Sequence, residues 1–316
     1  MPVDSKEVLR VLCPDGAAVV LETDNRQWLT TVDCPTSRGL RGYVTFRKPV
    51  PQEIDSWSHF LHGPDGHVVS NDKVVAPPYH IQWIGDPQHA RSHVHLTSMN
   101  VMVTNGKQLL YIIDQSPNKL PDLLPGRWAL VARDAFNGVV LWSKPLPVWQ
   151  PYYVKDRNSY PVDLHRRLVA VGGTVFVTLS IHGPVSALDA ATGKLLQTYA
   201  GTEKTEDIIC SDGILYLSIN TGAVEQIDRR RMAYRHTEPR KKRLVAIEAA
   251  TGRRLWEIEG ADTDELMPMT LAVKGSQVYF QNSKHVICLD RSTGDVRWRA
   301  PRPSEYFRPG WSSPTL

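Results

Sequence analysis

The chain has 316 residues, of which 41% are hydrophobic and 22% are charged, and its formal net charge is +4. This composition is ordinary for a folded globular protein of one or two domains, and the mild charge does not predict nucleic-acid binding. No stretch approaches about 18 consecutive apolar residues, and the first residues form no apolar leader, so we expect neither a membrane span nor a signal peptide.

Residues 1–50 predict a small α/β segment. Residues 7–12 fit a short amphipathic helix, a Pro-x-Gly turn follows, and residues 17–21 fit an apolar strand. Two more strands are expected at 28–32 and 42–47. The segment resembles the C-terminal part of a class I S-adenosylmethionine methyltransferase. Because that family's cofactor loop lies upstream of this helix, the resemblance implies a remnant that cannot bind the cofactor alone.

Residues 51–76 are predicted to be a linker, because a Lys-Pro-Val-Pro run at 48–51 is stiff and extended. Most histidines of the chain follow between residues 59 and 95. Among them His89, His93 and His95 are candidate metal ligands, since neutral imidazole is a common ligand. The alternative is a polar loop that lines the axial mouth of the next domain, with the histidines bonded to carbonyl groups.

Residues 77–316 carry a repeat that predicts a β-propeller. Each copy has an apolar strand, an acidic residue, a turn closed by glycine and a second strand that usually ends on tryptophan, as in the run Leu188-Asp189-Ala190-Ala191-Thr192-Gly193. A second hairpin with its own glycine turn, such as Asn105-Gly106, precedes each copy. The structural residues of the repeat are Asp134, Gly138, Trp142, Asp189, Gly193, Glu248, Gly252, Trp256, Asp290, Gly294 and Trp298.

The spacing of the repeat supports blades of four strands. The turn glycines stand at 138, 193, 252 and 294, so they are separated by 55, 59 and 42 residues. The shortest separation matches the period of about 40 to 45 residues that propeller blades show. The region therefore holds four blades, with a partial fifth from residues 77–98, whose start at 77–84 is expected to be a strand.

The repeat resembles that of pyrroloquinoline quinone (PQQ) type β-propellers, a superfamily that includes quinoprotein alcohol dehydrogenases and outer-membrane assembly lipoproteins of the BamB type. Quinoprotein dehydrogenases hold PQQ between a tryptophan and a disulfide of adjacent cysteines, with calcium bound beside a catalytic aspartate. Cys13, Cys34, Cys210 and Cys288 contain no adjacent pair. We therefore expect no catalytic residues and no cofactor in this chain, and PQQ enters by family resemblance only.

Three functions stay open. The first is a non-catalytic binding or scaffold propeller that holds a protein partner or a small ligand at its loops. The second is part of a PQQ- and calcium-dependent oxidoreductase, and the third is part of a multidomain methyltransferase-propeller protein. Cys210 and Cys288 are expected to be small core residues, because both stand in apolar strands.

Two insertions, at residues 149–164 and 221–243, interrupt the repeat. The second is strongly basic and forms a candidate docking loop for an acidic partner, although it equally fits a solvated loop. Its basic residues are Arg229, Arg230, Arg231, Arg240, Lys241, Lys242 and Arg243.

Residues 310–316 resemble the opening strand of another blade, so we interpret the sequence as a fragment of a longer protein with an incomplete ring. The resemblance implies that such a parent protein is periplasmic, although this chain carries no localisation signal.

Overall fold

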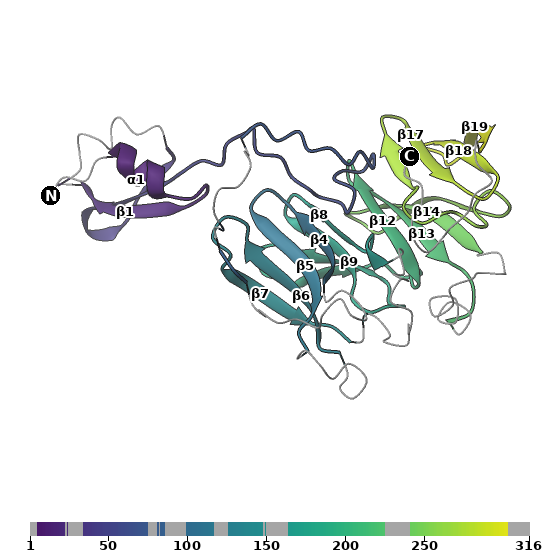
Figure 1. Ribbon diagram of the computed structural model, residues 1–316, viewed down its shortest axis with the longest axis horizontal. Helices are drawn as coiled ribbons and strands as arrows, with labels where there is room; N and C mark the ends of the chain where they lie inside the picture. The colour runs from purple at the N-terminus through teal and green to yellow at the C-terminus, as the bar shows by residue number, and fades with distance from the viewer. Residues whose placement is uncertain are drawn as a thin grey trace.

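The computed structural model describes residues 5–22, 24, 34–74, 81, 83–85, 99–116, 126–147, 149, 164–224 and 241–302. The predicted class is confirmed: the described chain is mainly β, with one three-stranded and four four-stranded sheets. Figure 1 shows the small sheet at one end of the molecule and the four larger sheets side by side. No helix among the described residues is long and apolar enough to cross a membrane.

The N-terminal segment contains helix α1 (Ser5–Val11), strands β1 (Ala17–Leu21), β2 (Thr36–Arg38) and β3 (Tyr43–Arg47), and the 3-10 turn η1 (Leu40–Gly42). The strands pair antiparallel in the order β1-β3-β2, and Phe46 is fully buried. The helix and the strands predicted at 17–21 and 42–47 are confirmed, whereas the one predicted at 28–32 lies outside the described residues. The segment meets the larger sheets through Lys107, whose Nζ lies 3.1 Å from Oδ1 of Asp15.

Each larger sheet is one blade of four consecutive antiparallel strands. Blade 1 has β4 (Met99–Thr104), β5 (Gln108–Asp114), β6 (Trp128–Asp134) and β7 (Val140–Pro145); blade 2 has β8 (Leu168–Val171), β9 (Thr174–Thr178), β10 (Val185–Asp189) and β11 (Leu195–Thr198). Blade 3 has β12 (Thr205–Ser211), β13 (Ile214–Asn220), β14 (Lys242–Glu248) and β15 (Arg254–Glu259); blade 4 has β16 (Ala272–Lys274), β17 (Gln277–Gln281), β18 (His285–Asp290) and β19 (Val296–Pro301). Both predicted hairpins of each copy are thus confirmed.

The acidic residue organises the turn between the last two strands of each blade. In blade 2, Oδ1 of Asp189 accepts hydrogen bonds from the backbone N–H of Thr192 at 2.8 Å and from its hydroxyl at 2.6 Å. The glycine that follows, Gly193, has a φ of 68°, a conformation that side chains disfavour. The turn is therefore encoded locally, by an acceptor at its start and a glycine at its end.

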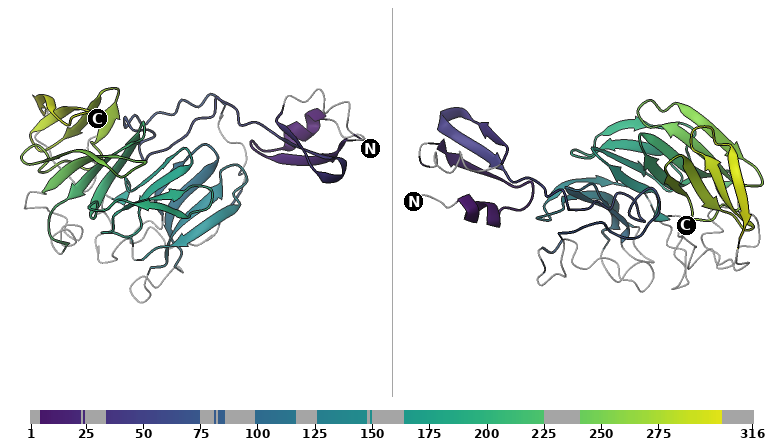
Figure 2. Two further views of the ribbon diagram at one scale, coloured as in Figure 1. Left: turned by 180° about the vertical axis from the view of Figure 1, so that it is seen from behind. Right: turned by 90° about the horizontal axis from the view of Figure 1, so that it is seen from above.

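The first strands β4, β8, β12 and β16 of successive blades contact one another, and apolar clusters fill the spaces between neighbouring blades. Cys210 and Cys288 are buried, as predicted. Figure 1 shows β4, β8 and β12 next to one another, with β7 and β19 farther out, and Figure 2 shows the same blades from two other sides, so the first strands lie innermost.

Tryptophans of the repeat pack on the turn of the next blade. Trp142 donates from Nε1 to the Ala190 carbonyl at 2.8 Å, and a Cβ added to Gly193 would lie 2.7 Å from its ring. Trp256 likewise donates from Nε1 to the Arg291 carbonyl at 2.9 Å, and a Cβ added to Gly294 would lie 2.8 Å from its ring. Gly193 and Gly294 are thus required twice, by their backbone conformation and by the tryptophan ring above them.

Two of these contacts depart from the repeat. Trp83 lies over Gly138 in the manner of a repeat tryptophan, although the described residues 81 and 83–85 form no strand, contrary to the strand expected at 77–84. Residues 77–80 and 82 of that stretch lie outside the described part. In blade 2, Gln197 stands where the other blades have tryptophan, and Tyr199 donates its hydroxyl to the equivalent carbonyl, Ala249, at 2.6 Å. Tyr199 points to the same face as Gln197 because strand side chains alternate.

We call the contact surface between two neighbouring blades a seam. Replacing Tyr199 by phenylalanine should weaken the seam between blades 2 and 3. We expect a loss of about 1 kcal/mol in the free energy of unfolding, because the part-buried Ala249 carbonyl loses its donor. Urea denaturation measures the change, with the exposed Tyr43→Phe as the matched control. Equal midpoints for the two variants would mean that the hydroxyl contributes nothing to the seam.

Candidate functional site

The centre of the propeller is occupied by the chain's own residues 57–64, which we call the axial strap. The strap accepts one hydrogen bond from the innermost strand of every blade. The Trp57 carbonyl accepts from Thr104 N at 2.8 Å, the Ser58 carbonyl from Ala170 N at 2.9 Å, His59 Nε2 from Cys210 N at 3.1 Å and the Pro64 carbonyl from Val273 N at 2.8 Å. This part of the predicted linker is thus hydrogen-bonded into the propeller, where it satisfies donors on four strand edges.

A tight turn inside the strap is held from outside by Asp55. His59 and His62 exchange backbone hydrogen bonds at 3.2 and 3.1 Å, and His62 Nε2 lies 2.7 Å from Oδ2 of Asp55. Burial acts to raise the pKa of Asp55, but hydrogen bonds from the backbone of Asn71, from His62 and from Ser56 outweigh it and lower the pKa to about 2. Asp55 is therefore ionised whenever the protein is folded at ordinary pH.

His59 is the most deeply enclosed part of the strap. Burial, with the nearby charge of Arg166, lowers the pKa of its imidazole to about 3. Ser58 Oγ lies 2.8 Å from Nδ1, and Nε2 accepts the Cys210 N–H. Since an acceptor nitrogen must be unprotonated, the geometry holds the ring neutral.

The neutrality of His59 predicts acid sensitivity. A depressed pKa in the folded state means that the unfolded chain binds more protons below about pH 6.5, so stability is present above that pH and lost as the pH falls toward 3. The free energy of unfolding of the wild type should fall between pH 7 and pH 5, and we expect His59→Gln to make that fall about 2 kcal/mol smaller. Denaturant titrations at both pH values measure it, with the exposed His67→Gln as control. An unchanged pH dependence in His59→Gln would contradict a neutral buried ring.

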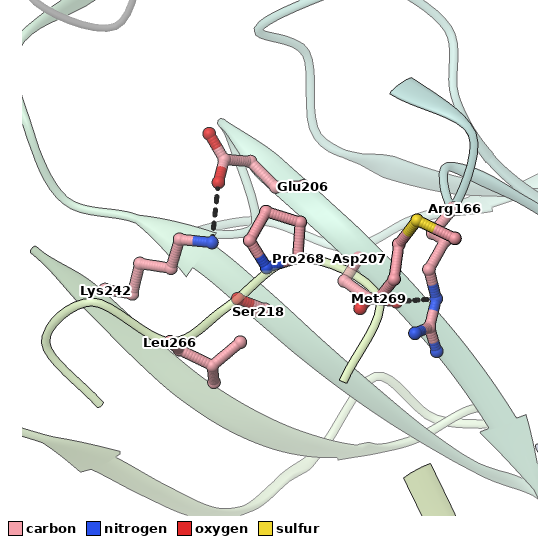
Figure 3. Close-up of a pocket in the computed structure, with 8 residues that line it drawn as sticks. All are labelled: Arg166, Glu206, Asp207, Ser218, Lys242, Leu266, Pro268 and Met269. Atoms are coloured by element: carbon pink, nitrogen blue, oxygen red, sulfur yellow. Dashed lines mark ion pairs between the residues drawn. The ribbon is translucent and has the colours of Figure 1, made fainter. Parts of the chain in front are cut away.

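Two buried ion pairs lie around the start of β12, at the end of the inner strands that is far from the strap (Figure 3). Nε of Arg166 lies 2.9 Å from Oδ1 of Asp207, and Nζ of Lys242 lies 2.9 Å from Oε2 of Glu206. All four side chains are at most 5% exposed. Arg166 also donates to the Leu271 carbonyl at 2.7 Å, so the pairs connect blades 2, 3 and 4.

The environment of Asp207 opposes its ionisation. Burial raises its pKa to about 6 despite the lowering effect of Arg166 and Lys242. A raised pKa in the folded state means that the contribution of this group is largest below about pH 4 and is lost as the pH rises through 6. Asp207 and His59 therefore act on acid stability with opposite signs.

The ion pairs form no ligand pocket. Arg166, Glu206, Asp207, Ser218, Lys242, Leu266, Pro268 and Met269 surround a hollow that does not hold a water-sized sphere. Cations suited to the carboxylates of PQQ are present, but Arg166 and Lys242 are already paired with Asp207 and Glu206. These residues do not fit PQQ without separation of the pairs.

The structure describes only some of the predicted site residues. His89, His93, His95, Arg229, Arg230, Arg231 and Arg240 lie outside the described residues. Lys241 is exposed, as a docking residue would be, but the two residues that follow it make contacts inside the propeller. Lys242 pairs with Glu206, and Arg243 bonds Glu257 at 3.0 Å and the Gly201 carbonyl at 2.6 Å. Lys242 and Arg243 thus both have structural partners within the propeller, and the docking role of the loop stays a prediction.

The repeat residues occupy the turns and seams already described, except Trp298, which is 43% exposed. Within the described ranges no group of three or more His, Cys, Asp or Glu side chains could hold a metal ion. Sequence reasoning missed His59 and the two ion pairs. One signal was available: Glu206-Asp207 at the head of an apolar strand, and Arg166-Arg167 before another, place charges where burial is expected.

Comparison with known proteins identifies a matching family. Residues 127–306 match the family model described as outer membrane protein assembly factor BamB. A crystal structure of BamB from Moraxella catarrhalis matches 64% of this chain and 64% of its own at 16% identity, with a TM-score of 0.33. Quinohemoprotein alcohol dehydrogenase ADHIIG from Pseudomonas putida HK5 matches 69% of this chain and 37% of its own at 17% identity, with a TM-score of 0.41.

A quinohemoprotein alcohol dehydrogenase from Comamonas testosteroni matches 67% of this chain and 36% of its own at 15% identity, with a TM-score of 0.40. The chain thus spans less than two thirds of these relatives. No curated protein sequence matches it.

Proposed function

Because the chain belongs to the family of the outer membrane protein assembly factor BamB, we propose that it is a non-catalytic β-propeller that binds a protein partner at its surface. The observation that carries the proposal is the filled centre. The axial strap bonds all four inner strands, and the ion pairs leave no space for a water-sized sphere. Because the described residues fill the axis in this way, we place the binding site on the outer surfaces.

The rival function, a PQQ-dependent oxidoreductase, requires room for a planar tricarboxylate. In the hollow that the two ion pairs line, that room is obtained by breaking Arg166–Asp207 or Lys242–Glu206. Separating a buried pair costs about 3 to 5 kcal/mol, which PQQ would have to supply from its own contacts. The filled centre therefore favours the binding role.

The test has two arms on the full chain, with the fold checked by circular dichroism. In the first, PQQ and Ca²⁺ are titrated while tryptophan fluorescence and dye-linked alcohol oxidation are followed; we expect neither saturable quenching nor turnover. In the second, a detergent-solubilised outer membrane protein is titrated, since the family description names outer membrane protein assembly, and we expect saturable binding.

Quenching by PQQ that disappears in Arg166→Met and survives in Arg254→Met would place the quinone at the axis and overturn the proposal. Arg254 is the matched control because it pairs with Glu257 at the exposed rim. Absence of binding in the second arm, in a folded sample, would also count against the proposed role.

A further inference from the structure

The N-terminal segment shares no apolar core with the blades within the described residues. We call its described residues 5–22 and 34–47 the lobe. Its buried residues Val44 and Phe46 belong to none of the apolar clusters of the propeller. Figure 1 shows the lobe at one end of the molecule, apart from the stacked blades. Parts of a chain that are not joined by a large apolar interface are expected to move relative to one another.

The polar contact between the described residues of the lobe and of the blades is an exposed ion pair. Nζ of Lys107, in the hairpin turn between β4 and β5 of blade 1, lies 3.1 Å from Oδ1 of Asp15. The two side chains are 59% and 27% exposed. Pairs of this kind are weak and are screened by salt, so this contact is broken at small cost.

Asp15 keeps a second cation when Lys107 leaves. Nη1 of Arg47, which belongs to the lobe itself, lies 3.6 Å from the same Oδ1 and donates to the Asp15 carbonyl at 2.6 Å. The carboxylate therefore has a positive neighbour whether or not the lobe touches blade 1. Breaking the Lys107 contact leaves no buried charge behind, because both of its side chains reach solvent.

The connection between the lobe and the strap is short and stiff. Lys48 N donates to the Gly16 carbonyl at 2.8 Å, which ties Lys48 to the lobe. The Pro51 carbonyl accepts from Ile54 N at 3.3 Å, in the turn that leads to the strap. Two residues lie between these anchors, and the first is a proline whose ring fixes φ. The lobe should therefore pivot as a rigid body rather than diffuse on a flexible tether.

We propose that the Asp15–Lys107 pair is a salt-sensitive latch that holds the lobe against blade 1, and that the lobe pivots away when the pair is broken. Release leaves the hairpin turn of Lys107 open to solvent. The latch would thus control access to one part of the outer surface. It does not depend on which ligand that surface binds.

Distances between two spin labels on the full chain test the latch, one label on the lobe and one on blade 1. The labels replace exposed residues in a chain that lacks its two partly exposed cysteines, with the substitutions S37C, V139C, C13S and C34S. The two remaining cysteines are buried and should stay unlabelled. From about 50 mM to about 1 M NaCl, the ratio of released to latched molecules should rise about two- to fivefold, the range expected for an exposed pair.

Variants of the pair separate the latch from a general effect of salt. Lys107→Gln should raise the ratio already at low salt and remove its salt response, whereas Lys194→Gln, at an exposed lysine of blade 2, is the matched control and should behave like the wild type. Asp15→Asn should act like Lys107→Gln, and the double variant should add nothing further. Asparagine suits this position because Asp15 has a φ of 61°.

Two results would overturn the inference. One is an identical distance distribution of the wild type at both salt concentrations. The other is a salt response that survives in Lys107→Gln. Because no ligand is present in these measurements, this inference and the proposed function can fail separately.

Discussion

Replacing Lys242 by methionine is expected to destabilise the protein by about 3 to 5 kcal/mol, the cost of leaving a buried charge without its partner. Lys242 is 1% exposed, and its Nζ is 2.9 Å from Oε2 of Glu206, which is itself buried. Methionine nearly fills the volume of lysine, so the loss would come from the uncompensated carboxylate rather than from a cavity. Urea denaturation at pH 7 measures the change.

The neighbouring residue provides the control. Lys241 belongs to the same basic run but is exposed, so Lys241→Met should change the free energy of unfolding by less than about 0.5 kcal/mol. The double variant Lys242→Met/Glu206→Leu should recover most of the loss, because apolar groups of similar volume often replace a buried pair without cost. Equal effects of Lys241→Met and Lys242→Met would refute the assignment of Lys242 to the propeller interior.

Gly193→Ala should cost about 2 to 4 kcal/mol, the sum of two separable penalties. The first is backbone strain, since φ is 68°, and the second is overpacking, since the new Cβ would lie 2.7 Å from Cε3 of Trp142. Trp142 would have to move away from the Ala190 carbonyl, which opens the seam between blades 1 and 2. Thermal unfolding followed by tryptophan fluorescence would report the weakened seam.

Gly213→Ala separates the two penalties. Gly213 has a φ of 75°, but a Cβ there meets nothing within 4 Å, so only the strain of about 1 kcal/mol is expected. The difference between the two variants therefore measures the packing of Trp142 on its turn. If both lose the same stability, the tryptophan contact contributes nothing to the seam.

The blades could be predicted because their signals are local. Asp189 and Thr192 are three residues apart, and Gly193 completes the same turn, so one short stretch specifies one hairpin. Four such turns, each preceded by a second glycine hairpin, imply a stack of blades. The departure at Gln197 was visible as a missing tryptophan, but its replacement by Tyr199 became evident only from the hydrogen bond to Ala249.

The central site could not be predicted, because its partners are far apart in the chain. His59 meets Cys210 across 151 residues, and Arg166 meets Leu271 across 105. A histidine-rich stretch after a proline run has no local pattern that distinguishes a linker from an axial strap. In the basic run, Lys241 and Lys242 differ only in which way the start of β14 turns each side chain.

The sequence by itself determined the blade, its strand order and its glycine turns, since backbone conformation and side-chain alternation act between near neighbours. Only the tertiary structure decided what fills the centre and which charges are buried. Those properties depend on burial and on long-range contacts, which arise when blades and strap pack together and have no expression in any single segment.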